Sequence, residues 1–348
     1  AGEERSLRRT CGYMPREVEY DLAGQKGYVV NKDGISKVDF EVVEDDVAPL
    51  PLIRYPESIR LAEDEKDVDI DPSGSFAVVR LEESIESTST SVWIMSLKDQ
   101  TYREIVLPAV PYDLDLSPAG DYALAVLPTL NQIAVMALPP DPDEPFVLRD
   151  VPSMFAGQSQ ISGDGGLVAL FSNQSGEELV GVYDMDEDSF DVIQLHKTVK
   201  TVAFTPDNEI MAVIHLKEEG PIEDPGDYEE VADHSYGYSL VRISDGVVRQ
   251  HLTKANPEPF LLHPDGSRIF LLQRDDAADV REVEIIYTDS YSVNTVKLGS
   301  PPVSVGYVPE SNKIFVSQQH GAGRITFIDE NENTQTITGF ELNDWIVE

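Results

Sequence analysis

Short runs of alternating apolar and polar residues recur along the chain, each followed by a tight turn and a second apolar run. Clear copies are residues 68–79 (VDIDPSGSFAVV), 114–126 (LDLSPAGDYALAV) and 260–272 (FLLHPDGSRIFLL). Alternation with a period of two is typical of strands with one buried face. Proline presets the first corner of a turn, and glycine tolerates the left-handed conformation that follows. Each copy therefore predicts a β-hairpin.

This hairpin unit occurs seven times. Its turn anchors are Leu22, Pro72, Pro118, Gly163, Pro206, Pro264 and Pro309. After each hairpin come a third strand ending in an acidic turn, such as SVWIMSLKD, and a fourth, such as FDVIQL. Four antiparallel strands per unit make one blade of a propeller. The sequence thus predicts an all-β fold: a seven-bladed β-propeller of four-stranded antiparallel blades.

The repeat also predicts the domain organisation. A lone four-stranded sheet has two apolar faces, so it must stack on its neighbours, and a closed ring removes the exposed ends. Residues 13–348 are expected to form a single seven-bladed propeller, with residues 1–12 as an N-terminal tail or closing strand. The fifth unit is the longest because Lys217 to Gly237 is inserted between its second and third strands.

The repeat resembles a known family. The turn proline, the apolar second strand and the third strand are clearest in residues 301–329, PPVSVGYVPESNKIFVSQQHGAGRITFID. This segment resembles the YVTN/lactonase-like group of WD40-type propellers. The resemblance implies the propeller fold and a bacterial, exported protein. It leaves function open, because one fold hosts many activities.

The chain is strongly acidic. Its 26 Lys and Arg residues against 64 Asp and Glu residues give a net charge of −38. Such a surface repels a phosphate backbone, so nucleic acid is not an expected partner, whereas cations and basic proteins are. The single cysteine, Cys11, excludes an intrachain disulfide and a cysteine-based metal cluster. No apolar run is long enough for a transmembrane segment.

Six carboxylates fall at equivalent places near the start of the first strand in three successive blades. They are Glu17, Glu19, Asp67, Asp69, Asp113 and Asp115. Alternate residues share one face of a strand, so each blade directs a pair of acids to one side. Clustered carboxylates either have raised pKa values or bind a hard cation such as Ca²⁺. The hypothesis is a calcium site at the channel mouth; the alternative is a water-filled channel lined with solvated acids.

The inserted segment Lys217 to Gly237 joins many acids to aromatic residues. Its candidate partner-binding residues, with the position just after it, are Tyr228, His234, Tyr236 and Tyr238. Aromatic side chains on a polar loop are common anchors at protein interfaces. The alternative is a disordered acidic loop, because acids and prolines are also enriched in disorder.

Hydrolase motifs are absent: the sequence holds neither G-x-S-x-G nor H-E-x-x-H, so no catalytic residue is assigned. We therefore expect a non-enzymatic binding or scaffold propeller, exported to the periplasm or cell surface. Its acidic long-loop face would bind a protein partner. The alternative is a metal-dependent hydrolase or lactonase-like enzyme with its site at the channel mouth.

Overall fold

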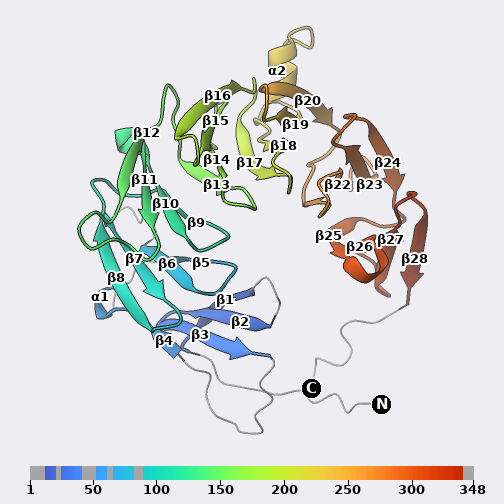
Figure 1. The fold of residues 1–348 in the computed structure, drawn as a ribbon. Helices are drawn as coiled ribbons and strands as arrows, with labels where there is room; N and C mark the ends of the chain where they lie inside the picture. Colours follow the sequence, from blue (N-terminus) through green and yellow to red (C-terminus); the bar gives the residue numbers. More distant parts are fainter. Residues whose placement is uncertain (1–11, 21–24, 41–51, 61–65, 82–88, 340–348) are drawn as a thin grey trace, which may run out of the picture. The chain divides into compact units, whose positions relative to one another are not determined.

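The computed structural model describes residues 12–20, 25–40, 52–60, 66–81 and 89–339. Their strands form seven four-stranded antiparallel sheets, and in each sheet the strands lie side by side in chain order (Figure 1). This confirms the predicted all-β, seven-bladed propeller fold. Residues 1–11 of the predicted tail lie outside the described residues.

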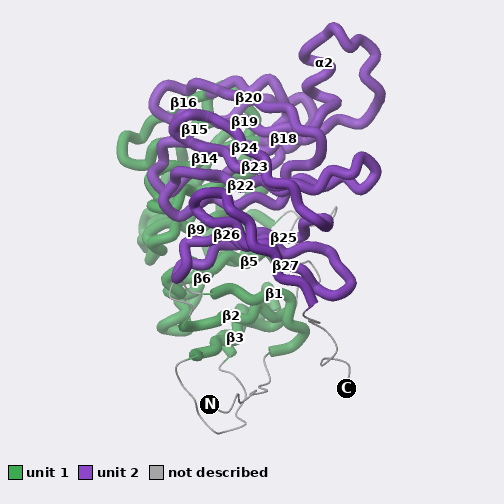
Figure 2. The backbone as a smooth tube through the Cα atoms, turned by 90° about the vertical axis from the view of Figure 1, so that its right-hand side faces the viewer, with its two compact units in different colours: residues 1–171, 181–192 green, residues 172–180, 193–348 purple. Residues whose placement is uncertain are grey.

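The chain divides into two compact units (Figure 2): residues 1–171 with 181–192, and residues 172–180 with 193–348. Unit 1 holds the first three sheets and most of the fourth. Their strands are β1(Pro15–Tyr20), β2(Lys26–Asn31), β3(Gly34–Asp39), β4(Leu52–Arg54), β5(Lys66–Ile70), β6(Phe76–Leu81), β7(Ser91–Ser96), β8(Thr101–Val106), β9(Asp113–Leu116), β10(Tyr122–Leu127), β11(Gln132–Ala137), β12(Val147–Asp150), β13(Gln158–Ile161), β14(Leu167–Phe171), β15(Leu179–Asp184) and β16(Ser189–Gln194).

Unit 2 holds the fifth, sixth and seventh sheets. Their strands are β17(Val199–Phe204), β18(Ile210–His215), β19(Tyr236–Arg242), β20(Val247–Thr253), β21(Phe260–Leu262), β22(Arg268–Asp275), β23(Val280–Tyr287), β24(Val293–Lys297), β25(Pro302–Val308), β26(Lys313–Gln318), β27(Arg324–Ile328) and β28(Thr334–Thr338). The short helices of the described chain are α1(Glu57–Arg60), α2(Tyr228–Asp233) and the 3₁₀ turns η1(Pro128–Leu130) and η2(Pro309–Ser311). None of the described helices is long and apolar enough to span a membrane.

The second strand of each sheet explains how neighbouring sheets pack. In β6, Ala77 and Val79 join the core shared with the first sheet, whereas Val78, between them, joins the core shared with the third. Successive side chains of a strand point to opposite faces, so a strand buried on both sides must be apolar at every position. This is why the second strand reads as a continuous apolar run.

The turn between the first two strands links one sheet to the next within unit 1. Gly74 has a φ of +69° and Gly165 a φ of +79°, the left-handed conformation expected of these turns. The Tyr28 hydroxyl donates a hydrogen bond to the Gly74 carbonyl at 3.2 Å, and the Tyr122 hydroxyl donates to that of Gly165 at 2.7 Å. The repeated turn therefore also fixes the stacking of adjacent sheets.

The predicted insertion in the fifth unit is present. It connects β18 to β19 and carries the helix α2. The Asp227 side chain caps this helix by accepting a hydrogen bond from the backbone N–H of Glu229 at 3.0 Å. The prediction of an insertion between the second and third strands is therefore confirmed.

Candidate functional site

The four aspartates of the second and third sheets form one group, which we call the carboxyl cluster: Asp67 and Asp69 on β5, and Asp113 and Asp115 on β9. Each pair occupies alternate positions of its strand and so shares a face. The negative charges of the other three all raise the pKa of Asp69. The structure therefore brings together the aspartates that the sequence analysis singled out.

Two neighbours contact the carboxyl cluster. Arg80, opposite Asp67 in the register of β5 and β6, pairs with it, with an Nη2 to Oδ2 distance of 2.8 Å. Ser159, from β13 in the fourth sheet, donates its backbone N–H to Asp113 at 2.7 Å and its hydroxyl to Asp115 at 2.5 Å. Within the part of the chain that the structure describes, the cluster thus has one cation, and one serine that donates its hydroxyl and backbone N–H, for four carboxyl groups.

This imbalance holds protons on the cluster. Burial, with the charge of Asp115 as the next cause, raises the pKa of Asp69 to about 8. Burial and then the charge of Asp113 raise the pKa of Asp115 to about 7, while burial also raises the pKa of Asp113. Desolvation and nearby like charge both disfavour the ionised form. At neutral pH the cluster therefore carries fewer than four negative charges.

The calcium prediction gains no support from this geometry. Among the described residues, no group of three or more His, Cys, Asp or Glu side chains is arranged to hold a metal ion. Asp67 is paired with Arg80, and Asp113 and Asp115 share Ser159. Calcium needs six to eight oxygen ligands around one point, and one carboxyl oxygen each of Asp67, Asp113 and Asp115 already has a partner.

The two glutamates of the first sheet differ from the aspartates in their surroundings. Glu17 is exposed and Glu19 is half-buried on β1. Burial raises the pKa of Glu19, with the charge of Glu17 as the next cause. Glu19 also raises the pKa of Asp69, so it lies near the rim of the carboxyl cluster. The sequence analysis treated all six acids alike, whereas the structure separates the four half-buried aspartates, three of which have a partner, from the exposed Glu17 and from Glu19.

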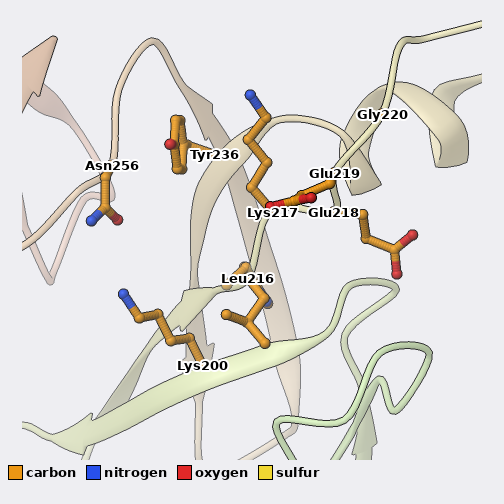
Figure 3. A pocket seen from close by; sticks show the side chains of 9 residues that line it. Lys200, Leu216, Lys217, Glu218, Glu219, Gly220, Tyr236 and Asn256 are labelled. Carbon is orange, nitrogen blue, oxygen red and sulfur yellow. The ribbon is translucent and has the colours of Figure 1, made fainter.

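Unit 2 contains a pocket of about 510 Å³, which we call the lysine pocket (Figure 3). It lies where the insertion leaves β18 and returns to β19. Its lining residues are Lys200, His215, Leu216, Lys217, Glu218, Glu219, Gly220, Tyr236 and Asn256. Pockets of this size accommodate small organic molecules.

The two ammonium groups of the lysine pocket are held differently. Lys200 pairs with Glu258, which also accepts a hydrogen bond from the Asn256 amide at 3.2 Å. The Nζ of Lys217 lies 4.9 Å from the centre of the Tyr236 ring, within range of a cation–π contact. In Figure 3 both lysine side chains extend away from Leu216. The pocket therefore presents two cations and an aromatic ring.

A buried polar network supports the pocket from behind. The imidazole of His215 is 1 % exposed; its Nδ1 contacts the Thr198 carbonyl at 3.2 Å and its Nε2 contacts the Ser239 hydroxyl at 2.7 Å. Burial lowers the pKa of His215 to about 4, so the ring is neutral at pH 7. A neutral ring donates from Nδ1 and accepts at Nε2 here. This arrangement fixes the end of β18, from which the pocket loop starts.

Lys197 fastens the other end of the inserted segment. Its ammonium is buried and donates to the carbonyls of Ala232 at 2.6 Å and Asp233 at 3.0 Å, at the C-terminus of α2. Burial lowers the pKa of Lys197 to about 8. Carbonyls at the end of a helix lack intrahelical partners and attract a cation. The lysine thereby holds the insertion against the fifth sheet.

The predicted partner-binding residues are divided by the structure. Tyr228 is exposed, and its hydroxyl donates to the Gln250 side chain at 3.1 Å. His234 contacts the Glu218 carbonyl at 3.2 Å, and Tyr236 lines the lysine pocket. Tyr238 is 2 % exposed and stacks on His251, so it belongs to the core and cannot serve as a surface anchor.

Sequence reasoning missed Lys200, His215 and Asn256. A weak signal existed for the first: residues 196–200, HKTVK, place two lysines at the start of β17 in a chain that has few cations. His215 gave no signal, because it continues an apolar strand, IMAVIH.

Comparisons with known proteins give the fold. No family profile and no curated protein sequence matches the chain. Among solved structures, Kuenenia stuttgartiensis hydrazine synthase is similar, with a TM-score of 0.52 and 16% identity over 93% of this chain and 95% of that chain. The dihydro-heme d1 dehydrogenase NirN in complex with DHE is also similar, with a TM-score of 0.56 and 10% identity over 94% of this chain and 67% of that chain.

These neighbours correct the functional expectation. The names of both describe enzymes, which contradicts our expectation of a non-enzymatic scaffold; the expected protein partner stays a prediction. Neither name describes a lactonase or another hydrolase, so the alternative gains no support either. At these identities the likeness establishes the fold alone. The ligand class has to be inferred from the residues of this chain.

Proposed function

We propose that the protein binds a small organic carboxylate in the lysine pocket. The proposal rests on one observation: the residues that line the pocket have an excess of hydrogen-bond donors. An ammonium group has three donors and no acceptor, so Lys200 keeps donors beyond its contact with Glu258, and Lys217 contacts only a ring face among the described groups. A ligand that satisfies them must be rich in acceptors.

The acids near the pocket limit the charge of the ligand. Glu218 and Glu219 line it, and Glu258 pairs with Lys200. Of these, Glu218 already accepts a hydrogen bond from the Ser175 hydroxyl at 2.5 Å. Because two cations face three acids, a strongly charged anion would be repelled. A ligand with one carboxylate fits this balance better.

The rest of the lining favours an organic body. Tyr236 offers a ring and Leu216 an apolar side chain, both of which bury carbon well. A simple inorganic ion would leave most of the pocket to water. We therefore expect a carboxylate attached to a planar or apolar group of small-molecule size.

The structural neighbours support a small-molecule function in general. One is named a synthase and the other a dehydrogenase in complex with DHE, so propellers of similar fold occur in proteins that act on small molecules. Membership of the YVTN/lactonase-like group, a single domain over residues 13–348, and export to the periplasm or cell surface stay predictions.

The proposal is tested by ligand-observed NMR with benzoate and its neutral counterpart benzamide. Benzoate should bind and benzamide should bind at least tenfold more weakly, because only the carboxylate engages the ammonium groups. Lys217→Met should raise the Kd of benzoate by about tenfold, which corresponds to about 1.4 kcal/mol. Lys98→Met, at an exposed turn of the second sheet, is the matched control and should change nothing.

Two results would overturn the proposal. One is equal binding of benzoate and benzamide, which would show that the donors play no part. The other is an unchanged Kd in both Lys217→Met and Tyr236→Ala, with thermal unfolding of both variants as in the wild type. Binding would then occur outside the lysine pocket.

A further inference from the structure

A second hollow in unit 2 gathers basic side chains in this acidic protein. It has a volume of about 340 Å³ and lies at the sixth sheet, between the start of β23 and the end of β24. We call it the basic hollow. Its charged lining residues are Lys254, Asp279, Arg281, Glu282 and Lys297.

The cations outnumber the acids in the basic hollow. Asp279 pairs with Arg281 at 2.9 Å. Glu282 lies 3.7 Å from Lys254 and faces Lys297 in the register of β23 and β24. Three cations against two acids leave one positive charge, in a chain whose net charge is −38. Such a local reversal of sign concentrates anions.

One donor in the hollow is unsatisfied. The Nε of Arg281 is buried and has no hydrogen-bond partner within the described chain, although the side chain as a whole is 36% exposed. A buried N–H without an acceptor costs about 1–3 kcal/mol. Because this Nε is buried in the structure, it would meet an oxygen atom bound in the hollow only after the partly exposed guanidinium turns.

From these observations we propose that the basic hollow binds an oxyanion of the phosphate class. Arginine donates in a planar fork that matches phosphate, and ammonium groups of lysine add charge from other directions. The tetrahedral anion carries enough oxygens to face Lys254, Arg281 and Lys297 together. A monocarboxylate has only two oxygens and one charge, which distinguishes this hollow from the lysine pocket.

Free phosphate and the phosphoryl group of an organic phosphate share this chemistry. The test uses isothermal titration calorimetry with inorganic phosphate in one arm and glycerol 3-phosphate in the other. Both are measured against sodium chloride at equal ionic strength, because salt alone screens the repulsion of a highly charged protein. We expect binding in at least one arm and none with chloride.

The variants locate the site. Arg281→Gln should weaken phosphate binding at least tenfold, and Lys297→Gln severalfold. Arg274→Gln is the matched control, because Arg274 lies on the neighbouring strand, pairs with Asp276 and does not line the hollow. Arg281→Lys keeps the positive charge but loses the planar fork of donors. Partial binding by this variant would indicate that the loss of binding in Arg281→Gln comes from the missing charge and donors and not from a folding defect.

Each outcome has a fixed meaning. Binding in either arm supports the proposal: inorganic phosphate alone points to the free ion, glycerol 3-phosphate alone to an organic phosphate, and both together to recognition of the phosphoryl group itself. No heat beyond that of chloride in either arm overturns it, as does unchanged binding in Arg281→Gln. Lys200→Met should leave phosphate binding unchanged, so this test is independent of the lysine pocket.

Discussion

Burial acts in opposite directions on the pKa values of the carboxyl cluster in unit 1 and of the buried Lys197 in unit 2. Burial raises the pKa of Asp69 to about 8 and lowers that of Lys197 to about 8. The charged form is disfavoured in both places. The two places differ in the groups that surround the charge. The neighbours of the aspartates are mostly other acids, whereas the ammonium group of Lys197 donates to two carbonyl oxygens.

The two regions therefore give opposite slopes of stability against pH. Asp69 binds a proton more tightly in the folded than in the unfolded chain, so its contribution is lost as pH rises from about 4 to about 8. His215 binds a proton less tightly when folded, so stability is gained as pH rises from about 4 to about 6.5. Between pH 6 and pH 8, the change of stability with pH is therefore determined mainly by the carboxyl cluster.

The largest effect is expected from Asp69→Asn. The variant keeps the shape of the protonated acid and cannot ionise, so it removes the cost of a buried charge. Each pKa unit corresponds to about 1.4 kcal/mol, and we expect the free energy of unfolding to increase by about 2 to 4 kcal/mol at pH 9. The increase should be smaller at pH 6. Urea unfolding at both pH values measures it.

Asp191→Asn is the control for this variant, because it makes the same change of net charge at an exposed position on β16. Its effect should be small at both pH values. If Asp69→Asn and Asp191→Asn stabilise the protein equally, the gain reflects net charge alone. The carboxyl cluster would then destabilise the folded protein no more than exposed acids do.

A smaller effect is expected from Ser159→Ala. The hydroxyl donates to Asp115 and lowers its pKa, so its loss should matter most when Asp115 is ionised. Hydrogen bonds to charged groups contribute about 1.5–3 kcal/mol and neutral ones about 1 kcal/mol. We expect destabilisation by about 2 kcal/mol at pH 9 and about 1 kcal/mol at pH 6, from urea unfolding.

Ser239→Ala is the matched change in unit 2. It also removes a hydroxyl from a buried ionisable group, but His215 is neutral throughout this pH range. Its cost should be about 1 kcal/mol at pH 6 and at pH 9 alike. A pH-dependent loss in Ser239→Ala, or a constant loss in Ser159→Ala, would contradict the comparison of the two regions.

The fold was predictable because the turn residues, the apolar runs and their spacing all indicate the same repeated unit. The turns around Pro72 and Pro118 and the continuous apolar run of residues 122–127 repeat with a nearly constant spacing. The grouping of the aspartates was predictable too, because the repeat places Asp67 and Asp113 at equivalent positions. Local pattern and periodicity are enough to define such features.

The sites were less predictable, because they depend on contacts between distant residues. Nothing in the sequence near Asp115 indicates Ser159, which comes from the next sheet. The lysine pocket joins Lys200 of β17, Tyr236 of β19 and Asn256 of the connection between β20 and β21. Tyr238 was assigned to a surface because the segment before it is polar, but β19 is buried throughout its central residues 237–241. Tertiary packing decided each case.

The central claim is that the lysine pocket binds an organic carboxylate, and a crystal structure with para-bromobenzoate tests it most directly. Bromine scatters X-rays anomalously, so its position is seen without assumptions about the ligand. The proposal predicts one bromine peak among Lys200, Lys217 and Tyr236, with the carboxylate against an ammonium group. A peak elsewhere, or none in crystals whose protein binds benzoate in solution, would contradict it.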